Sequence, residues 1–172
     1  LFFTFFGGGL GGNPEGDGLS HGNAPIGMAN IPPVEILESV YPVRFTNWGL
    51  RPDSGGPGRH RGGLGAIYEI ELLADAATLV ASGERAVFPA FGVLGGGASA
   101  VNRLVYDQDD GPTTPRIGTK LVGARLTRGQ RVRIESPGGG GYGPAGERAL
   151  DDIARDLRLE MVSVERAERD YA

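Results

Sequence analysis

Glycine is the residue that most limits how this chain can fold. It occupies 31 of 172 positions, more than twice the roughly 7% usual in proteins, and gathers in short runs such as residues 138–141. The runs keep no fixed period, which excludes collagen and simple repeats. Because glycine enters positive-φ conformations without steric cost, runs placed between apolar segments predict many short strands joined by tight turns. One such turn is expected at Gly129, where it would close a hairpin.

Two-residue alternation of apolar and polar side chains predicts the strands themselves. In residues 66–72, Tyr68 and Ile70 share one face while two glutamates occupy the other, and residues 131–135 repeat the pattern. These segments therefore belong to a half-buried sheet. The other strand candidates are residues 1–6, 43–50, 102–106 and 118–126.

One of these candidates changes parity in its middle. Val43 and Phe45 stand at odd positions, whereas Trp48 and Leu50 stand at even positions. A regular strand would send the two pairs to opposite faces. A bulge at residues 46–47 would bring all four apolar side chains to one face, so we expect a bulge there.

Helix is predicted in three short segments, two of them at the C-terminus. Residues 32–42 form a short helix that a proline ends. Near the C-terminus, Leu150, Ile153 and Leu157 make one helical stripe, and Ser163 can cap a second helix. We expect this pair of helices to pack on its own body or to dock on a partner subunit.

Together these segments predict a mainly β fold of the α+β class. A glycine-rich body, a β-sandwich or barrel-like structure, is expected over residues 1–145, with a short helix near its N-terminus. A helical tail is expected over residues 146–172. A chain of this length can bury roughly 70% of the surface that its unfolded form exposes, so a real core is expected.

Charge and cysteine content narrow the classes of partner and chemistry. The net charge is −4 and the sequence pI is near 5.2, which gives no general attraction to nucleic acid or to an anionic membrane. The absence of cysteine excludes disulfides, thiolate zinc sites and a cysteine nucleophile. Residues 1–6 are apolar but too short for a signal-peptide core or a membrane span, so the cytoplasm is the expected location. The chain starts at Leu1, which suggests a mature fragment or the tail of a longer polypeptide.

Residues 51–65, RPDSGGPGRHRGGLG, combine glycines with positive charge and invite an anion-binding interpretation. A Walker loop needs a lysine after its second glycine, but Leu64 stands there. A dinucleotide fingerprint should open a helix, whereas the residues that follow alternate as a strand does. The favoured interpretation is a turn that Asp53 stabilises by pairing with an arginine.

Contact with an anion or an acidic substrate stays open as the alternative for this loop. Its candidates are Arg59, His60 and Arg61, which concentrate positive charge in an acidic chain. A Ser-His-Asp triad assembled from Ser54, His60 and Asp53 is disfavoured, because neighbours in one loop rarely reach the required geometry.

The other histidine, His21, also lies in a polar segment. Asp17, His21 and Asn23 could supply oxygen and imidazole ligands, but their spacing is no recognised metal pattern and two histidines are few for a catalytic site. A polar loop is favoured, and one ligand donated to a site built elsewhere stays open.

The run of glycines at 138–141 admits two interpretations. It could form a nest of backbone amides around a phosphate. No lysine follows it, so we favour a main chain that passes close to another backbone while Tyr142 packs across it.

Several segments together resemble the C-terminal part of the hydantoinase B/5-oxoprolinase family. They include GGGLGGNPEGDGLS, IPPVEILESVYPVRF, LRPDSGGPGRHRGGLGAIYE, FPAFGVLGGG, RLTRGQRVRIESPGGGGYG and the tail DIARDLRLEMVSVERAERDY. The resemblance spans nearly the whole chain. It implies one part of an ATP-dependent machine that opens a cyclic amide or imide through a phosphorylated intermediate.

The resemblance also implies partners and cofactors. ATP and Mg would bind to an A-type, sugar-kinase-like subunit, and a divalent metal would bind to the N-terminal part of the B-type subunit, which has no counterpart here. This chain is expected to be roughly the last third of such a subunit, inactive alone and part of a hetero-oligomer. An ATP-dependent ketone carboxylase and a non-catalytic assembly module are the alternatives.

One segment departs from the family pattern. Relatives are often more basic before the FP pair of SGERAVFPAFG, at residues 82–92, which puts any anion handling by that segment in doubt. No catalytic role can be transferred residue by residue. The remaining hypothesis is that Arg59 or Arg61 helps to hold an anionic substrate or intermediate.

Overall fold

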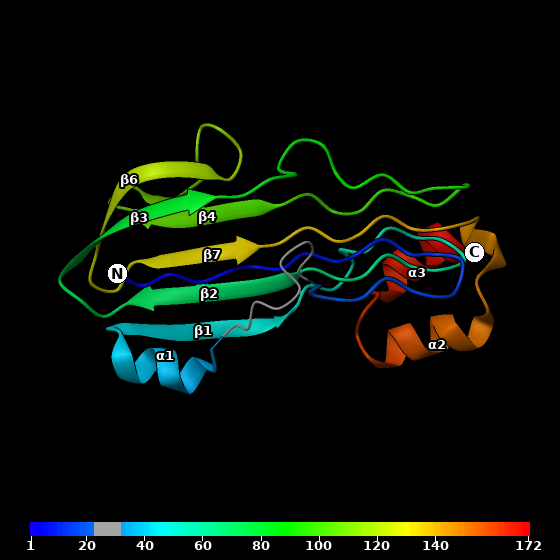
Figure 1. Cartoon of the computed structure of the whole chain (residues 1–172), viewed down its shortest axis with the longest axis horizontal. Helices are drawn as coiled ribbons and strands as arrows, with labels where there is room; N and C mark the ends of the chain where they lie inside the picture. The colour runs from blue at the N-terminus through cyan, green and yellow to red at the C-terminus, as the bar shows by residue number, and fades with distance from the viewer. Residues whose placement is uncertain (23–31) are drawn as a thin grey trace.

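The computed structural model describes residues 1–22 and 32–172. The molecule is elongated: two β-sheets lie at one end, a pair of helices lies at the other, and long extended segments run between them (Figure 1). The strands are β1 (Val43–Leu50), β2 (Ala66–Leu72), β3 (Ala76–Ser82), β4 (Arg103–Gln108), β5 (Gly111–Thr113), β6 (Lys120–Thr127) and β7 (Arg131–Glu135). The helices are α1 (Val34–Val40), a 3₁₀ turn η1 (Ala145–Glu147), α2 (Leu150–Arg158) and α3 (Val164–Tyr171).

The strands form two antiparallel sheets that pack face to face. The larger sheet has the order β1-β2-β7-β4-β5, and the smaller sheet pairs β3 with β6. Leu126 of the smaller sheet joins Leu72, Leu104 and Val132 of the larger sheet in one apolar cluster. Neither sheet closes on itself, so the predicted α+β class is confirmed as an open two-layer sandwich rather than a barrel. Strands β3 and β5 were not among the expected segments.

The expected bulge in β1 is present. The register between β1 and β2 shifts between Phe45 and Asn47, and Trp48 then pairs with Tyr68. The rings of Phe45 and Trp48 lie 5.4 Å apart, and Trp48 lies 4.7 Å from Tyr68. The extra residue therefore gathers these aromatic side chains on one face of the sheet.

Gly129 closes a turn but not the hairpin that we expected. It has a φ of +84° and lies between β6 and β7. Those two strands belong to different sheets, so the turn carries the chain from one layer to the other. A local turn signal does not specify which strand the next segment pairs with.

The first six residues run extended across the larger sheet without forming a strand, contrary to expectation (Figure 1). Alternate side chains face the molecule as they would in a strand: Phe2 packs on Tyr41 and Phe45, and Phe6 packs on Tyr68. The apolar alternation thus reports burial on one side, and the segment covers the face of the sheet instead of extending its edge.

The glycine runs build the extended half of the molecule. A Cβ placed on Gly138, Gly139, Gly140 or Gly141 would lie 1.9–2.0 Å from a backbone oxygen of Ser54, Leu10, Phe91 or Pro57 respectively. Gly138 and Gly141, three residues apart, both face residues 54–57, whereas the two glycines between them face other segments. A repeat of three residues matches the turn of a polyproline II helix, and the neighbouring backbones are so close that only glycine fits.

Most glycines therefore do not serve the turns that the sequence suggested. Only six described glycines have a positive φ, at positions 95, 111, 118, 123, 129 and 143. Close approach of backbones and positive φ both require the absence of a Cβ, so composition alone does not separate them.

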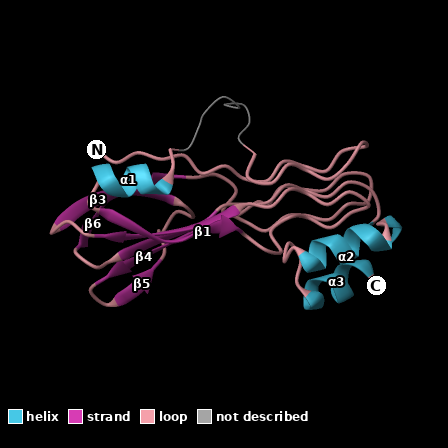
Figure 2. Ribbon diagram, turned by 90° about the horizontal axis from the view of Figure 1, so that it is seen from below, coloured by secondary structure: helices cyan, strands magenta, loops and turns pink. Residues whose placement is uncertain are grey.

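The two tail helices lie on one side of the extended segments, near the end that is far from the sheets (Figure 2). Ser163 caps α3 as expected, since its Oγ accepts from the Arg166 N–H at 3.1 Å. Of the predicted stripe, Ile153 and Leu157 are half-buried, whereas Leu150 is exposed. Within residues 1–22 and 32–172, no helix has the length and apolar character needed to cross a bilayer.

Candidate functional site

The candidate residues of the 51–65 loop lie where the extended segments meet the tail. Arg61 is buried at this junction with 4% of its surface exposed. Its Nε lies 3.0 Å from Oδ2 of Asp156 in α2, and its Nη1 donates to the Gly62 carbonyl at 2.6 Å. The guanidinium is thus engaged within the chain, a geometry that favours a structural role for this arginine.

A second buried arginine completes the junction. Arg148 donates to Asp17 through Nη1 at 2.7 Å and through Nη2 at 2.8 Å, and Nη2 also lies 2.7 Å from Asp156. The Asp17 carboxylate also accepts from the backbone N–H of Arg61 at 2.7 Å. We call Asp17, Arg61, Arg148 and Asp156 the tail clasp, because they tie two glycine-rich segments to the C-terminal tail.

The clasp fixes the charge state of Asp17. Burial by itself raises the pKa of this carboxyl, but the hydrogen bonds and charge of Arg148, helped by Arg61, outweigh burial and hold the pKa below its usual value. Asp17 is therefore an anion at neutral pH and neutralises part of the positive charge that the loop concentrates.

Arg59 and His60 lie outside the clasp and are more accessible. The Arg59 guanidinium lies 5.8 Å from the centre of the Tyr142 ring, and its Nη1 lies 3.8 Å from Glu147. His60 is half-buried and forms a backbone bridge with Tyr142. Of the three candidates for anion contact in this loop, Arg59 and His60 are the two whose side chains are not fully buried.

Asp53 does not pair with an arginine of its loop, contrary to expectation. Its Oδ1 accepts from the Ser163 N–H at 2.8 Å, and its own N–H donates to the Met161 carbonyl at 3.0 Å. Ser54 bonds the backbone of Arg51 and Gly65 and is fully buried. The loop is thus held by the tail and by its own main chain.

Two backbone amides of the glycine run at 138–141, and the amide that follows the run, are already used between the extended segments. Gly139 donates to the Gly63 carbonyl at 2.9 Å and Gly141 to the Gly97 carbonyl at 2.9 Å. Tyr142 donates to the His60 carbonyl at 2.9 Å. These N–H groups do not form a phosphate nest, and the close-approach interpretation of the run is confirmed by its neighbours.

His21 lies apart from the clasp. Its Nε2 is hydrogen-bonded to the hydroxyl of Tyr68, which is fully buried, and its backbone adopts a φ of +50°. Burial lowers the pKa of His21, which favours the neutral imidazole at neutral pH. Asn23 lies outside the described residues. Within the described part of the chain, no three acidic, histidine or cysteine side chains gather as a metal site would require.

Sequence reasoning did not identify Arg148 and Asp156. Asp156 follows Ile153 by three residues and so lies beside the apolar stripe predicted for this helix. A carboxylate in that position signals a buried partner, because an unpaired charge would be costly there. The sequence does not name the partner, which is 95 residues away.

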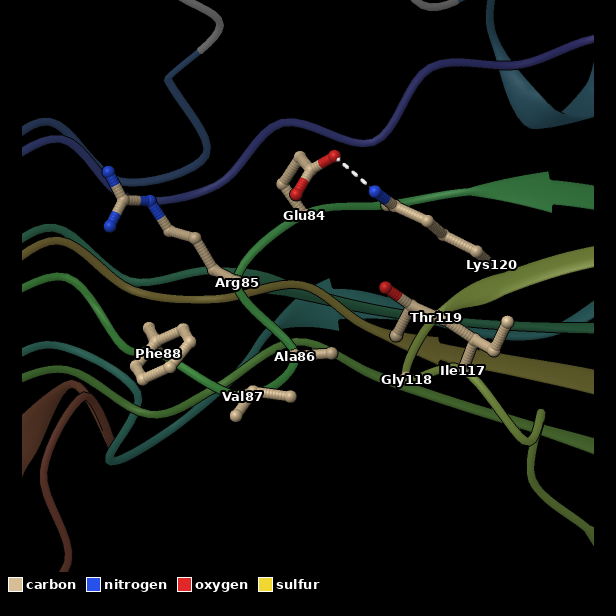
Figure 3. A pocket seen from close by; sticks show the side chains of 10 residues that line it. Glu84, Arg85, Ala86, Val87, Phe88, Ile117, Gly118, Thr119 and Lys120 are labelled. Atoms are coloured by element: carbon tan, nitrogen blue, oxygen red, sulfur yellow. Dashed lines mark ion pairs between the residues drawn. The ribbon is translucent and has the colours of Figure 1, made fainter.

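Two surface grooves accompany these features. One, of about 480 Å³, lies between residues 83–88 and residues 117–120 beside the smaller sheet (Figure 3). The other, of about 350 Å³, lies against the tail between Pro52 and residues 157–164. Neither contains the candidate residues.

Comparison with known proteins identifies what the chain resembles. Residues 1–145 match the model of the family described as Hydantoinase B/oxoprolinase. The chain is 37% identical over 142 residues to the beta chain of the caprolactamase of Pseudomonas jessenii, covering 80% of this chain and 24% of that protein. It is 27% identical over 171 residues to the B component of a putative D-/L-hydantoinase of a Pseudomonas species, covering 99% of this chain and 29% of that protein.

Solved structures agree with the sequence matches. The ATP-dependent caprolactamase of Pseudomonas jessenii superposes with a TM-score of 0.78 at 31% identity, over 95% of this chain and 29% of that one. Acetone carboxylase in its nucleotide-free state superposes with a TM-score of 0.81 at 20% identity, over 95% of this chain and 26% of that one. The chain thus spans between 24% and 29% of the length of these relatives.

Proposed function

Because the chain belongs to the Hydantoinase B/oxoprolinase family, we propose that it is a component of an ATP-dependent enzyme that opens a cyclic amide or imide. The observation that carries this proposal is the 37% identity to a caprolactamase subunit, since a lactam is a cyclic amide. The hydantoinase relative acts, by its name, on a related ring. Hydrolysis of an amide is slow because nitrogen is a poor leaving group, and phosphorylation of the ring amide would make it reactive toward water.

In this proposal the chemistry is shared among polypeptides. ATP and Mg bind to an A-type subunit, and the remaining N-terminal part of the B-type subunit supplies a divalent metal. This chain completes the wall of the active site and helps to shield a phosphorylated intermediate from bulk water. Alone it is inactive, and the assembly is a hetero-oligomer in the cytoplasm, without nucleic acid or membrane.

The residues of this chain take two roles. The tail clasp, built on Arg61 and Asp17, positions the 51–65 loop against the tail. Arg59 and His60, held beside Tyr142, are the side chains we assign to contact with an anionic group. His21 is a weaker candidate, because its imidazole is already bonded to Tyr68.

The experiment is reconstitution of this chain with the ATP-binding subunit and the rest of the B-type polypeptide. We expect ATP hydrolysis that depends on a cyclic amide or imide, assayed with hydantoin, 5-oxoproline and caprolactam in turn. This chain by itself should show no turnover. Turnover of any of these rings by the isolated chain would reject the shared-site proposal.

Ketone carboxylation is the second candidate. It is favoured by the superposition on acetone carboxylase, but at 20% identity that likeness concerns the fold alone. Its signature would be ATP turnover that requires bicarbonate and a ketone. An assembly module without substrate contact, whose helical tail drives oligomerisation, is the third candidate. An intact complex with full activity after deletion of the residues beyond Pro144 would count against it.

A further inference from the structure

The groove between residues 83–88 and 117–120 is a preformed surface feature. One wall is fixed by Asn102, whose side chain donates to the Glu84 carbonyl and whose backbone donates to the Arg85 carbonyl, both at 2.9 Å. The other wall is a tight turn in which the backbone N–H of Lys120 donates to the Ile117 carbonyl at 2.9 Å. Both walls are thus held by hydrogen bonds without any occupant.

The walls meet at a floor that leaves no room for larger side chains. A Cβ on Gly118 would lie 2.7 Å from the Cβ of Ala86, and Gly118 has a φ of +54°. The Gly83 N–H donates across the floor to the Thr119 carbonyl at 3.2 Å. Thr119 is buried, with 4% of its surface exposed, and its hydroxyl has no hydrogen-bond partner within the described residues.

The upper walls of the groove are apolar and open to solvent. Val87, Phe88 and Ile117 are 71%, 80% and 70% exposed, and they flank the floor in Figure 3. The ion pair of Glu84 and Lys120, 2.7 Å apart, bridges the rim. Such a cluster of exposed apolar side chains with a charged rim has the anatomy of an interface.

The family match indicates which occupant fits. All residues of this groove lie within residues 1–145, the region that matches the family, whereas most of the tail groove lies beyond it. The relatives are about four times longer than the part they share with this chain, since the match covers 24% of the caprolactamase subunit. A segment of the family's own polypeptide is therefore available to every member.

We propose that this groove seats a segment of the hydantoinase B polypeptide that lies outside these 172 residues, through apolar side chains packed against Phe88 and Ile117. This inference rests on the proposed function, because it takes the rest of the B-type subunit as a partner. It deepens that function by naming the surface that joins the two parts.

The first test places a photo-crosslinking residue, p-benzoylphenylalanine, at Phe88 in the protein expressed in its native host. We expect mass spectrometry to find the cross-link on hydantoinase B sequence outside these residues. Capture of a second copy of this chain, or of the ATP-binding subunit, overturns the proposal. So does an assembled complex that gives no cross-link at this position. The same probe at Leu150, which is 81% exposed on the tail, is the control and should not capture the same peptide.

The second test measures association. In the Phe88→Ser/Ile117→Ser variant, retention of the remaining B-type polypeptide, expressed as a separate chain, should weaken on the order of a hundredfold, from two lost apolar burials. Both side chains are exposed in this chain, so the thermal midpoint of the isolated variant should stay within a few degrees of wild type. The matched control is Leu150→Ser. Equal weakening by the control, or no weakening by the double variant, overturns the proposal.

These tests separate the inference from the proposed function. A wild-type complex that turns over a cyclic amide but gives no cross-link at Phe88 rejects the groove assignment alone. A cross-link to hydantoinase B sequence in a complex that turns over no ring rejects the proposed chemistry and leaves the groove assignment standing.

Discussion

Arg61 and Asp156 form a buried salt bridge that joins the glycine-rich loop to the tail, with Nε and Oδ2 3.0 Å apart. The two residues are 95 positions apart in the chain. Each is almost completely buried. Arg61 also forms an ion pair with Asp17, and Asp156 also forms one with Arg148. In a site of low dielectric, removing one partner leaves an uncompensated charge, so the pair determines how firmly the tail is held.

The first prediction concerns that pair. Asp156→Ala should lower the free energy of unfolding by about 3–5 kcal/mol, because two buried guanidinium groups lose their shared carboxylate. The measurement is urea unfolding followed by circular dichroism. Asp152→Ala, which removes the surface pair with Arg155, is the control and should cost less than about 1 kcal/mol. Equal losses of stability in the two variants would show that the buried pair contributes no more than the surface pair.

The second prediction separates the two arginines of the loop. Arg61→Ala should destabilise the chain by about 3–5 kcal/mol, because Asp156 and Asp17 lose a partner. Arg59→Ala should change stability by less than about 1 kcal/mol, since its contact with Glu147 is exposed. In the reconstituted complex, Arg59→Ala should instead raise the KM for substrate. Unchanged turnover and KM in this variant would dismiss the anion contact.

Local patterns predicted local features well. The alternation of Tyr68 and Ile70 marked β2, the change of parity marked the bulge after Phe45, and Ser163 marked the start of α3. Each of these depends on neighbours within a few residues, so the sequence states them directly. The prediction of a strand over residues 1–6 was wrong, because alternation shows only that one side of the segment is buried, and an extended segment without strand pairing can bury one side as well.

Long-range features could not be read in the same way. The pairing of β6 with β3 rather than β7 depends on which apolar faces meet in the core, and many pairings satisfy one pattern. The partners of Arg61 and Asp53 lie in the tail, so proximity in the sequence suggested the wrong neighbours. The glycine runs were recognised, but their function as closely packed extended segments depends on backbones that lie far apart in the chain.

The third prediction tests the close packing of the glycine run at 138–141 against neighbouring backbones. Gly139→Ala places a Cβ 1.9 Å from the Leu10 carbonyl oxygen and should destabilise the chain by more than about 3 kcal/mol or prevent folding, since two backbones must separate. The matched control is Gly146→Ala in η1, where the Cβ meets no atom within 4 Å. That variant should be neutral or slightly stabilising. Thermal midpoints of both variants provide the measurement, and a fully stable Gly139→Ala protein would refute the enclosed three-residue turn.

The last prediction concerns the pH dependence of the tail clasp. The folded-state pKa of Asp17 lies below the unfolded value of 3.8, because Arg148 and Arg61 outweigh the effect of burial. The clasp therefore contributes its full stability above about pH 4, and this contribution is lost as the pH falls from the unfolded pKa through the folded pKa. Asp17→Asn removes the titrating group and nearly preserves its size, so the variant should be less stable than wild type at pH 7.

Comparing the wild-type protein with Asp17→Asn isolates the contribution of Asp17. Other carboxyls with lowered pKa values, such as Asp170, remain in the variant, so both proteins lose the stability that those carboxyls contribute as the pH falls. Thermal midpoints measured from pH 7 to pH 2 should therefore converge as Asp17 becomes protonated in the wild-type protein. If the difference between wild type and Asp17→Asn stays constant down to pH 2, the titration of Asp17 is not coupled to folding, and the clasp does not act through the charge of this carboxylate.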